Sequence, residues 1–444
     1  MIDVSPGIAT LVMIAAVIAA VLIGYPLVFS IGGIALLLGF LAWGTSFFPT
    51  IYFALWGIAT NYTFLAVPLF IFMGMMMGRS GVADKLFGVL HLWLGGLRGG
   101  LAIATVMLGT AVAACVGVIG ASVSMLGLLA LPAMLERNYN KELACGAICA
   151  GGTLGILIPP SVMLVIYGPT ASISVGKLFM GAFMPGLLLS TLYSSYIAIR
   201  SYIQKGLAPS IPLEQRTAPL GTKVKLLFTS LFPILFVIVA VLGSIFFGIA
   251  APTEAAAVGA LASIILVAGY KKLNLTVLNE TMYGTLKIGS YVIFFAAAAI
   301  AFTNVFLGLG CGNVVSDLIL SAPFGRWGAF AVVMLLVFVL GMFVDWVGII
   351  FIMVPIITPI GVALGFDKIW FAVMVCVNLQ MAFLSPPLAY AIFYLKGVTT
   401  PEMGIDTIHI IRGVIPYIAL IAVALVLMTV FPEIVTWLPG MMVK

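Results

Sequence analysis

Two pairs of adjacent prolines, Pro159-Pro160 and Pro386-Pro387, each follow an apolar run of this chain. A proline has no backbone N–H and clashes with the preceding helical turn, so two in succession break a helix. Carbonyl oxygens about one turn upstream then lose their helical donors; they lie near Gly155, Ile156, Ala382 and Phe383. Within a membrane such freed carbonyls are suitable cation ligands, and the helix beyond the break presents a positive dipole end to an anion. The pattern favours two ion sites, and its alternative is a pair of structural kinks.

Hydroxyl and carboxyl groups interrupt two further apolar segments. Gly120-Ala121-Ser122-Val123-Ser124 combines a glycine, which suits an unwound turn, with two hydroxyls. Asp345 lies alone in apolar sequence, where an ionisable side chain is costly and marks function by default. A sodium ion would neutralise it. The alternatives are that the serines only pack helices together and that Asp345 caps a helix starting at Trp346.

The composition requires a membrane around these segments. Of the 444 residues, 64% are hydrophobic and 7% charged, and the mean hydropathy is +1.31; a soluble domain is about 45–50% apolar and about 25% charged. A soluble fold could not hide that much apolar surface, which excludes a nucleic-acid-binding protein, a disulfide-stapled secreted domain and a cytosolic enzyme. No Walker A pattern is present and the only histidines are His91 and His409. Neither ATP hydrolysis nor a transition-metal site is therefore expected, and no enzyme activity.

The chain divides into two halves that resemble each other. A polar stretch at 200–225, with three prolines, is predicted to be a cytoplasmic linker between repeat 1 at 1–199 and repeat 2 at 226–444. When the two halves are aligned without gaps so that Pro159 matches Pro386, the two double prolines coincide. The same alignment pairs Pro132 with Pro359, Lys141 with Lys368, Tyr167 with Tyr394, Gly32 with Gly259 and Gly186 with Gly413. Each double proline thus has another proline at the same distance upstream, which scattered identities do not explain. An internal repeat is predicted.

Each half is predicted to contain about five transmembrane helices, a re-entrant helical hairpin and an interfacial arm helix. The hairpins are expected at 99–135 and 327–364, which are too long for one span of about 20 residues and too short for two. Their weak centres would lie against protein or a water-filled cavity. The broken helices are expected at 143–167 and 370–394, and the arm helices at 50–63 and 273–286, where a plain loop is the alternative.

An odd number of spans in each half makes the two repeats inverted. With the N-terminus outside, 15 of the 19 Lys and Arg side chains fall on the inner face, and the other four, Lys177, Arg326, Lys368 and Lys444, on the outer face. Cytoplasmic loops carry an excess of basic residues, so both termini are predicted to be periplasmic. The expected fold class is an all-α polytopic membrane protein of two inverted repeats.

Over essentially its whole length the chain resembles the large membrane subunit, DctM type, of tripartite ATP-independent periplasmic (TRAP) transporters. The residues that carry the resemblance are Gly120-Ala121-Ser122-Val123, Gly152-Thr153-Leu154-Gly155 through Pro159-Pro160-Ser161, Tyr167-Gly168, Leu178-Phe179 with Pro185-Gly186, the stretch from Pro252 to Gly259, and Gly341 to Asp345. The resemblance implies a Na⁺-coupled, elevator-type symporter in a bacterial or archaeal cytoplasmic (inner) membrane, with no cofactor besides the coupling ion. The implied partners are a small four-helix membrane subunit (Q type), a periplasmic substrate-binding protein (P type), the lipid bilayer, and an organic anion, either a carboxylate or a sulfonate.

The resemblance also implies where the ions and the substrate bind. The expected Na⁺ ligands are Gly120, Ser122, Ser124, Thr153, Gly155 and Pro159 in the first half, and Asp345, Gln380, Ala382, Ser385 and Pro386 in the second. The substrate is expected between the hairpin tips, beside Ser122, Ser161, Gly348 and Pro387. Because Gln380-Met381-Ala382 stands where the first half has Thr153-Leu154-Gly155, the second ion site need not copy the first.

The mobile transport core is expected at about 65–174 and 288–396, with the remainder of the chain as scaffold. Two rival functions stay open at this point. One is a stand-alone ion-coupled anion transporter of related architecture that needs no binding protein. The other is an anion channel, which would conduct without Na⁺ and much faster than a carrier.

Overall fold

The computed structural model describes residues 5–212 and 219–442, and within them every regular element is a helix. Eight helical segments of this part are long and apolar enough to cross a membrane, judged by length and composition. The expected all-α polytopic membrane fold is therefore confirmed. A bilayer offers backbone groups no water, so a spanning segment must satisfy its N–H and C=O groups internally, as a helix does.

The first half of the chain runs from α1 to α10. Polar side chains begin several of its helices: the Asn140 side chain accepts the Leu143 N–H ahead of α8, and Ser174 accepts the Lys177 N–H ahead of α10, as N-cap residues do. The elements are α1 (Pro6–Ile23), α2 (Leu27–Trp43), η1 (Gly44–Phe47), α3 (Phe48–Ala59), η2 (Tyr62–Leu65), α4 (Ala66–Arg79), α5 (Val82–Leu94), α6 (Gly100–Val116), α7 (Ile119–Leu135), α8 (Lys141–Thr153), η3 (Leu154–Ile156), α9 (Val162–Ala171) and α10 (Val175–Ile203).

The second half follows the same order, from α11 to α21. Its elements are α11 (Leu220–Ile238), the π-helical turn η5 (Val239–Gly243), α12 (Ser244–Phe246), α13 (Pro252–Gly269), α14 (Leu275–Gly308), α15 (Cys311–Leu320), α16 (Gly325–Gly341), α17 (Trp346–Ala363), α18 (Lys368–Leu384), α19 (Tyr390–Val398), η6 (Pro401–Met403), α20 (Thr407–Val430) and α21 (Glu433–Gly440).

Helix bounds in the two halves recur at the spacing of the sequence repeat. α7 begins at Ile119 and α17 at Trp346, while α8 begins at Lys141 and α18 at Lys368, so both pairs are offset by the shift that superimposes the double prolines. The segments expected as hairpins are the contacting helix pairs α6–α7 and α16–α17, and those expected as broken helices are α8–α9 and α18–α19. The inverted orientation of the halves and the membrane depth of the hairpins stay predictions.

The halves differ at the expected arm helices. In the first half, α3 is separate from α4: the chain turns at Thr60-Asn61, where Asn61 Oδ1 accepts the Thr63 N–H at 2.9 Å. In the second half the expected arm at 273–286 is the first part of α14, whose 34 residues span about 51 Å at about 1.5 Å per residue. The expectation of a separate second arm helix is wrong. Lys287-Ile288 stand where the first half has Thr60-Asn61, and neither residue favours a turn.

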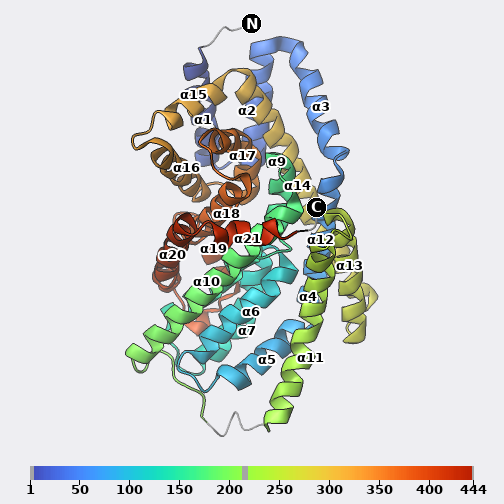
Figure 1. Ribbon diagram of the computed structural model, residues 1–444, viewed down its shortest axis with the longest axis vertical. Coiled ribbons are helices and arrows are strands. Elements are labelled where there is room, and N and C mark those ends of the chain that lie inside the picture. Colours follow the sequence, from blue (N-terminus) through green and yellow to red (C-terminus); the bar gives the residue numbers. More distant parts are fainter. Residues whose placement is uncertain (1–4, 213–218, 443–444) are drawn as a thin grey trace.

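Helices from both halves of the chain pack against one another. Figure 1 shows α4, α11 and α13 along one flank, with the pair α16–α17 and helices α18–α20 on the opposite side. α13 packs on α4, and α14 packs on α2 and α4, whereas α8 is enclosed by α6, α7 and α20. A Cβ on Gly146 of α8 would overlap the Gly413 carbonyl of α20, a close crossing of the kind that small residues permit in membranes. The Trp370 Nε1–H also donates to the Met428 carbonyl at 2.9 Å, joining α18 to α20.

The chain after α10 is fastened to the loop that precedes the first hairpin. α10 extends to Ile203 and α11 begins at Leu220, so the expected linker 200–225 overlaps a helix at both ends, and residues 213–218 lie outside the described part. The Gly99 N–H donates to the Ala208 carbonyl at 3.1 Å, and the Ile211 N–H donates to the Gly95 carbonyl at 2.7 Å. Ala208 and Ile211 are buried, so this short strap ties the end of α10 to the start of α6.

Candidate ion and substrate site

The first helix break lies at the first double proline. α8 ends at Thr153 and continues as the single turn η3; the Pro159-Pro160 peptide is cis, and α9 begins at Val162. The Ile156 carbonyl would accept N–H groups three or four residues ahead, but those positions are the two prolines, which have none. The Ser161 hydroxyl donates to that carbonyl instead. One of the carbonyls expected to be free is thus satisfied by a side chain.

The second break has the same backbone form with different donors. α18 ends at Leu384, the Pro386-Pro387 peptide is cis, and α19 begins at Tyr390. The Ser385 N–H donates to the Ala382 carbonyl at 3.0 Å, and the Ser385 hydroxyl donates to the Met381 carbonyl at 3.0 Å. The Phe383 carbonyl would accept N–H groups from the residues three and four ahead, but these are Pro386 and Pro387, which have none. Leu388 stands where the first half has Ser161, so no equivalent hydroxyl is available to the Phe383 carbonyl.

Ser122 and Gly155 meet beside the first break. The Ser122 side chain is only 1% exposed, and its hydroxyl has no hydrogen-bond partner in the described part of the chain. A Cβ built on Gly155 would lie 2.9 Å from Ser122 Oγ, so only a glycine leaves room there. Burying a hydroxyl without a partner costs free energy. The unpartnered oxygen beside an unwound helix end fits an oxygen-ligated cation.

Gln380 and Thr153 occupy equivalent positions of the two halves and touch each other. Gln380 Nε2 donates to Thr153 Oγ1 at 3.2 Å and to the Tyr193 hydroxyl at 3.4 Å. The Thr153 hydroxyl donates to the Ala150 carbonyl at 2.9 Å. Gln380 is fully buried, and its Oε1 has no partner among residues 5–212 and 219–442. Gln380 therefore joins the two broken helices at their contact and links α18 to α10.

Asp345 lies at the tip of the second hairpin among tyrosines. It precedes the first residue of α17 but makes no side-chain capping hydrogen bond, so the capping role considered for it does not describe this side chain. The Tyr291 hydroxyl of α14 donates to Asp345 Oδ2 at 3.4 Å. The carboxylate also interacts electrostatically with Tyr390 and Tyr394, one turn apart on α19. The Leu388 N–H donates to the Met342 carbonyl at 3.3 Å, which fixes this hairpin tip to the second break.

The tyrosine cluster reaches the tip of the first hairpin. A Cβ on Gly120 would lie 2.8 Å from the Tyr394 ring, so the start of α7 packs directly on α19. Tyr291 is 43% exposed and Tyr394 41% exposed. Asp345 is half-buried, and Pro386 and Pro387 are exposed. Partly exposed carboxyl and phenol groups thus lie near the exposed prolines of the second break.

The sequence reasoning missed these tyrosines, although the repeat contains a signal for them. When the halves are aligned on their double prolines, Tyr394 matches a tyrosine of the first half. The other members of the cluster match apolar residues of the first half. The pairs are Tyr291 with Phe64, Asp345 with Val118, and Tyr390 with Met163. A polar group that stands in only one half is not required by the shared architecture. Its position points instead to binding chemistry.

The remaining expected site residues have mixed environments. Ser124 is half-buried, and Pro159 is buried beside the first break. Among the expected substrate contacts, the Ser161 hydroxyl already donates to the Ile156 carbonyl. Gly348 packs against the Phe295 ring, which would lie 2.9 Å from a Cβ added to that glycine. Pro387, in contrast, is exposed at the second break.

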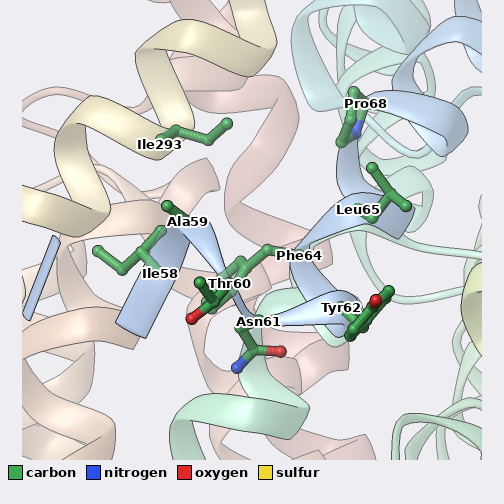
Figure 2. Close-up of a pocket in the computed structure, with 9 residues that line it drawn as sticks. All are labelled: Ile58, Ala59, Thr60, Asn61, Tyr62, Phe64, Leu65, Pro68 and Ile293. Carbon is green, nitrogen blue, oxygen red and sulfur yellow. The ribbon is translucent and has the colours of Figure 1, made fainter. Parts of the chain in front are cut away.

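A separate cavity lies where α3 joins α4. It has a volume of about 590 Å³ and is lined by Thr60 and Asn61 together with apolar side chains of η2, α4 and α14. Figure 2 shows Ile293 on one side of it and Tyr62, Leu65 and Pro68 on the other. None of the expected ion or substrate residues lines this cavity. It holds no charged side chain that could bind an anion.

The fold defines the class of protein. The chain is similar to the Alcanivorax borkumensis YdaH transporter (TM-score 0.63, 15% identity, covering 98% of this chain and 100% of that one). It is also similar to Neisseria gonorrhoeae MtrF (TM-score 0.55, 14% identity, 86% and 82% covered). At such identities the likeness concerns the fold alone, which is that of a polytopic helical membrane protein.

The sequence defines the family. The family model described as tripartite ATP-independent periplasmic transporter, DctM component, matches residues 14–434. The C4-dicarboxylate TRAP transporter large permease protein DctM of Vibrio cholerae is 31% identical, with 96% of each chain covered. The DctM protein of Pseudomonas aeruginosa is also 31% identical (86% of this chain and 87% of that one), and the isethionate TRAP transporter permease protein DctMQ of Oleidesulfovibrio alaskensis is 30% identical (86% of this chain and 58% of that one). This chain belongs to the DctM family of TRAP transporter large permeases, as the motifs predicted.

Proposed function

We propose that this permease imports a small organic anion across the cytoplasmic membrane, coupled to Na⁺ entry, by an elevator mechanism. The observation that carries the proposal is the contact of Ser122 with Gly155. A buried hydroxyl without a partner in the described residues faces the unwound end of α8. Hydroxyl and carbonyl oxygens at an interrupted helix are ligands that suit Na⁺, so this contact supports a first ion site.

A second Na⁺ is proposed at the second break, beside Asp345. The Phe383 carbonyl loses both helical donors to Pro386 and Pro387, and Leu388 supplies no replacement hydroxyl. The hydrogen bond from Leu388 to Met342 holds that break against the hairpin tip which carries Asp345. Among the other expected ligands, Ala382 already gives its carbonyl to the Ser385 N–H. A carboxylate together with freed backbone oxygens supports a charged second site.

The substrate is proposed to lie between the two hairpin tips, against Tyr390 and Tyr394. Tyr394 touches Gly120 of the first tip and interacts with Asp345 of the second. Phenol hydroxyls are neutral donors and would bind a carboxylate or sulfonate, while bound Na⁺ supplies the compensating charge. Each Na⁺ entering the cell contributes about 2.3 kcal/mol per 100 mV of membrane potential. Relatives named for C4-dicarboxylate, isethionate and sialic acid support this substrate class.

The proposed partners are a periplasmic substrate-binding protein and a small membrane subunit. The family's description as a tripartite periplasmic transporter supports three components. The name DctMQ of the isethionate relative joins M to Q, which supports a Q-type component as a partner of the M component. Both chain termini are proposed to be periplasmic.

The moving body is proposed to include α10 and α20, which the sequence assigns to the scaffold. α20 packs closely on α8 through Gly146 and Gly413 and accepts a hydrogen bond from Trp370 of α18. α10 is joined to α18 by the Gln380–Tyr193 hydrogen bond. Sliding these helices past the broken helices would disrupt buried contacts.

Uptake by proteoliposomes tests the proposal. The permease, its small subunit and the cognate binding protein are reconstituted, and labelled organic acids are offered with an inward Na⁺ gradient or with choline in place of Na⁺. We expect uptake that requires Na⁺ and rises strongly when the binding protein is added. Equal uptake without the binding protein would favour the stand-alone transporter. Current that persists without Na⁺ would favour the channel.

A further inference from the structure

A second hollow of the molecule lies far from the helix breaks, between α5, α11 and α13. It has a volume of about 720 Å³, and its lining includes Asp84, Lys85 and His91 of α5, Thr229 and Ser230 of α11, and Tyr270, which directly follows α13. No expected ion or substrate residue lines it. We call this hollow the α5–α11 groove.

Basic side chains surround the α5–α11 groove. Lys85 Nζ lies 4.0 Å above the centre of the Tyr270 ring, a cation–π contact that holds the ammonium at the groove wall. The Lys272 side chain lies over Gly81, immediately before α5. At the other end of α5, the Trp93 Nε1–H donates to the Lys223 carbonyl at 3.3 Å, which brings the start of α11 to this place.

One excess positive charge lies beside the groove at neutral pH. Burial and the Arg137 guanidinium lower the pKa of His91 below its usual value of 6.5, so this imidazole is neutral at pH 7. Asp84 is the acidic residue in the lining. Lys85 balances its negative charge within the lining, and Lys272, which lies beside the groove over Gly81, adds one positive charge that attracts an anionic group.

α11 carries exposed apolar side chains along its length, of which one lines the groove. Leu226 lines the groove and is 38% exposed, and beyond it Phe228 and Phe232 are 69% and 65% exposed. Ser230 is buried in the groove wall, and the Thr229 hydroxyl donates to the Leu226 carbonyl at 3.1 Å. A free phosphate ion would make no use of these apolar side chains. A molecule with an anionic head and acyl chains would cover both parts.

We propose that the α5–α11 groove binds an anionic glycerophospholipid, with its phosphate beside Lys85 and Lys272 and its acyl chains along α11. Basic pockets between transmembrane helices on the cytoplasmic side recognise anionic lipid head groups. The positive-inside rule assigns Lys85, Lys223 and Lys272 to that side. Because α5 belongs to the expected core, and α11 and α13 to the scaffold, the bound lipid contacts both bodies of the transporter.

Native mass spectrometry of the purified full-length permease tests the proposal. The protein is titrated with phosphatidylglycerol or with phosphatidylcholine of the same acyl chains, and the K85Q/K272Q double variant is compared with wild type. We expect phosphatidylglycerol to bind the wild type at least tenfold more tightly than phosphatidylcholine, and the double variant to lose that preference. Lys177→Gln serves as the matched control, because Lys177 is an exposed lysine at the start of α10.

Three outcomes would overturn the proposal. The first is equal binding of the two lipids by wild type, and the second is an unchanged preference for phosphatidylglycerol in the double variant. The third is a loss of that preference in the Lys177 control as large as in the double variant. Displacement of the lipid by millimolar inorganic phosphate would assign the groove to a free anion instead. A circular dichroism spectrum and elution volume matching wild type show that the double variant is folded. Lipid binding is measured without transport, so its failure is separate from a failure of the proposed import function.

Discussion

Replacing Ser122 with alanine distinguishes a cation ligand from a packing residue, because the two roles give opposite effects without Na⁺. The Ser122 hydroxyl is buried and has no hydrogen-bond partner in the described residues. An unpaired buried hydroxyl costs about 1–3 kcal/mol. In Na⁺-free buffer, S122A is therefore expected to unfold at a higher temperature than wild type, with a gain of about 1 kcal/mol.

With Na⁺ present the sign reverses. Loss of one oxygen ligand worth about 1–2 kcal/mol weakens Na⁺ binding by about 5–30-fold. Because a ligand stabilises the folded state in proportion to RT ln(1 + [L]/Kd), the Na⁺-dependent rise in unfolding temperature should shift to higher Na⁺ concentrations. The assay is thermal unfolding of purified protein at a fixed heating rate, with choline replacing Na⁺ at constant ionic strength. The Na⁺ concentration for half-maximal uptake should move in parallel.

A matched control is Ser263→Ala in α13. Ser263 is equally buried, but its hydroxyl donates to the Ala260 carbonyl at 2.7 Å. Its loss should slightly destabilise the protein and leave the Na⁺ response unchanged. If S122A instead behaves like S263A in both buffers, Ser122 is a packing residue and the first ion site is not at Gly155.

Three further changes test the remaining site residues. Gly155→Ala fills the space 2.9 Å from the Ser122 hydroxyl and should abolish the Na⁺-dependent rise in unfolding temperature; an unchanged rise would place the ion elsewhere. Asp345→Asn should reduce the number of Na⁺ ions per transport cycle, read from the charge moved per substrate, whereas Asp367→Ala, which removes a cap of α18, should lower stability alone. Tyr394→Phe removes one phenol donor and should raise the KM for substrate by about 5–10-fold, the effect of about 1–1.5 kcal/mol, with little change in the Na⁺ response. A KM equal to that of wild type would exclude this hydroxyl from the substrate site.

Local backbone chemistry made the helix breaks predictable. Pro159-Pro160 and Pro386-Pro387 cannot donate to preceding carbonyls, whatever surrounds them, and both breaks lie at these positions. The carboxyl group of Asp345 could be singled out from the sequence as well, because an ionisable residue in an apolar segment is costly and marks function by default. The all-helical class followed from the composition.

Contacts between distant residues were not predictable in this way. The Gln380–Thr153 hydrogen bond joins helices from different halves, and no property of either residue alone specifies it. The capture of the Ile156 carbonyl by Ser161 depends on the exact path of a turn. α14 continues through the expected arm because a helix ends only where a turn or cap competes with it, and Lys287-Ile288 offers neither.

The differences between the halves fix the charge of the proposed site. The first break offers neutral oxygens, from Ser122 and the backbone, so a Na⁺ bound there keeps its full charge. The second offers Asp345, where Val118 stands in the first half, so a Na⁺ bound there is neutralised. With both ions in place the space between the tips carries one net positive charge, which balances a monoanion held by Tyr390 and Tyr394. A dianion would leave one negative charge unbalanced, and two unit charges about 4 Å apart interact by about 4 kcal/mol at an effective dielectric constant of about 20. With the two proposed Na⁺ sites, import of a dicarboxylate would be favoured by a third cation or by protonation of the substrate, and the charge moved per molecule should distinguish it from import of a monoanion.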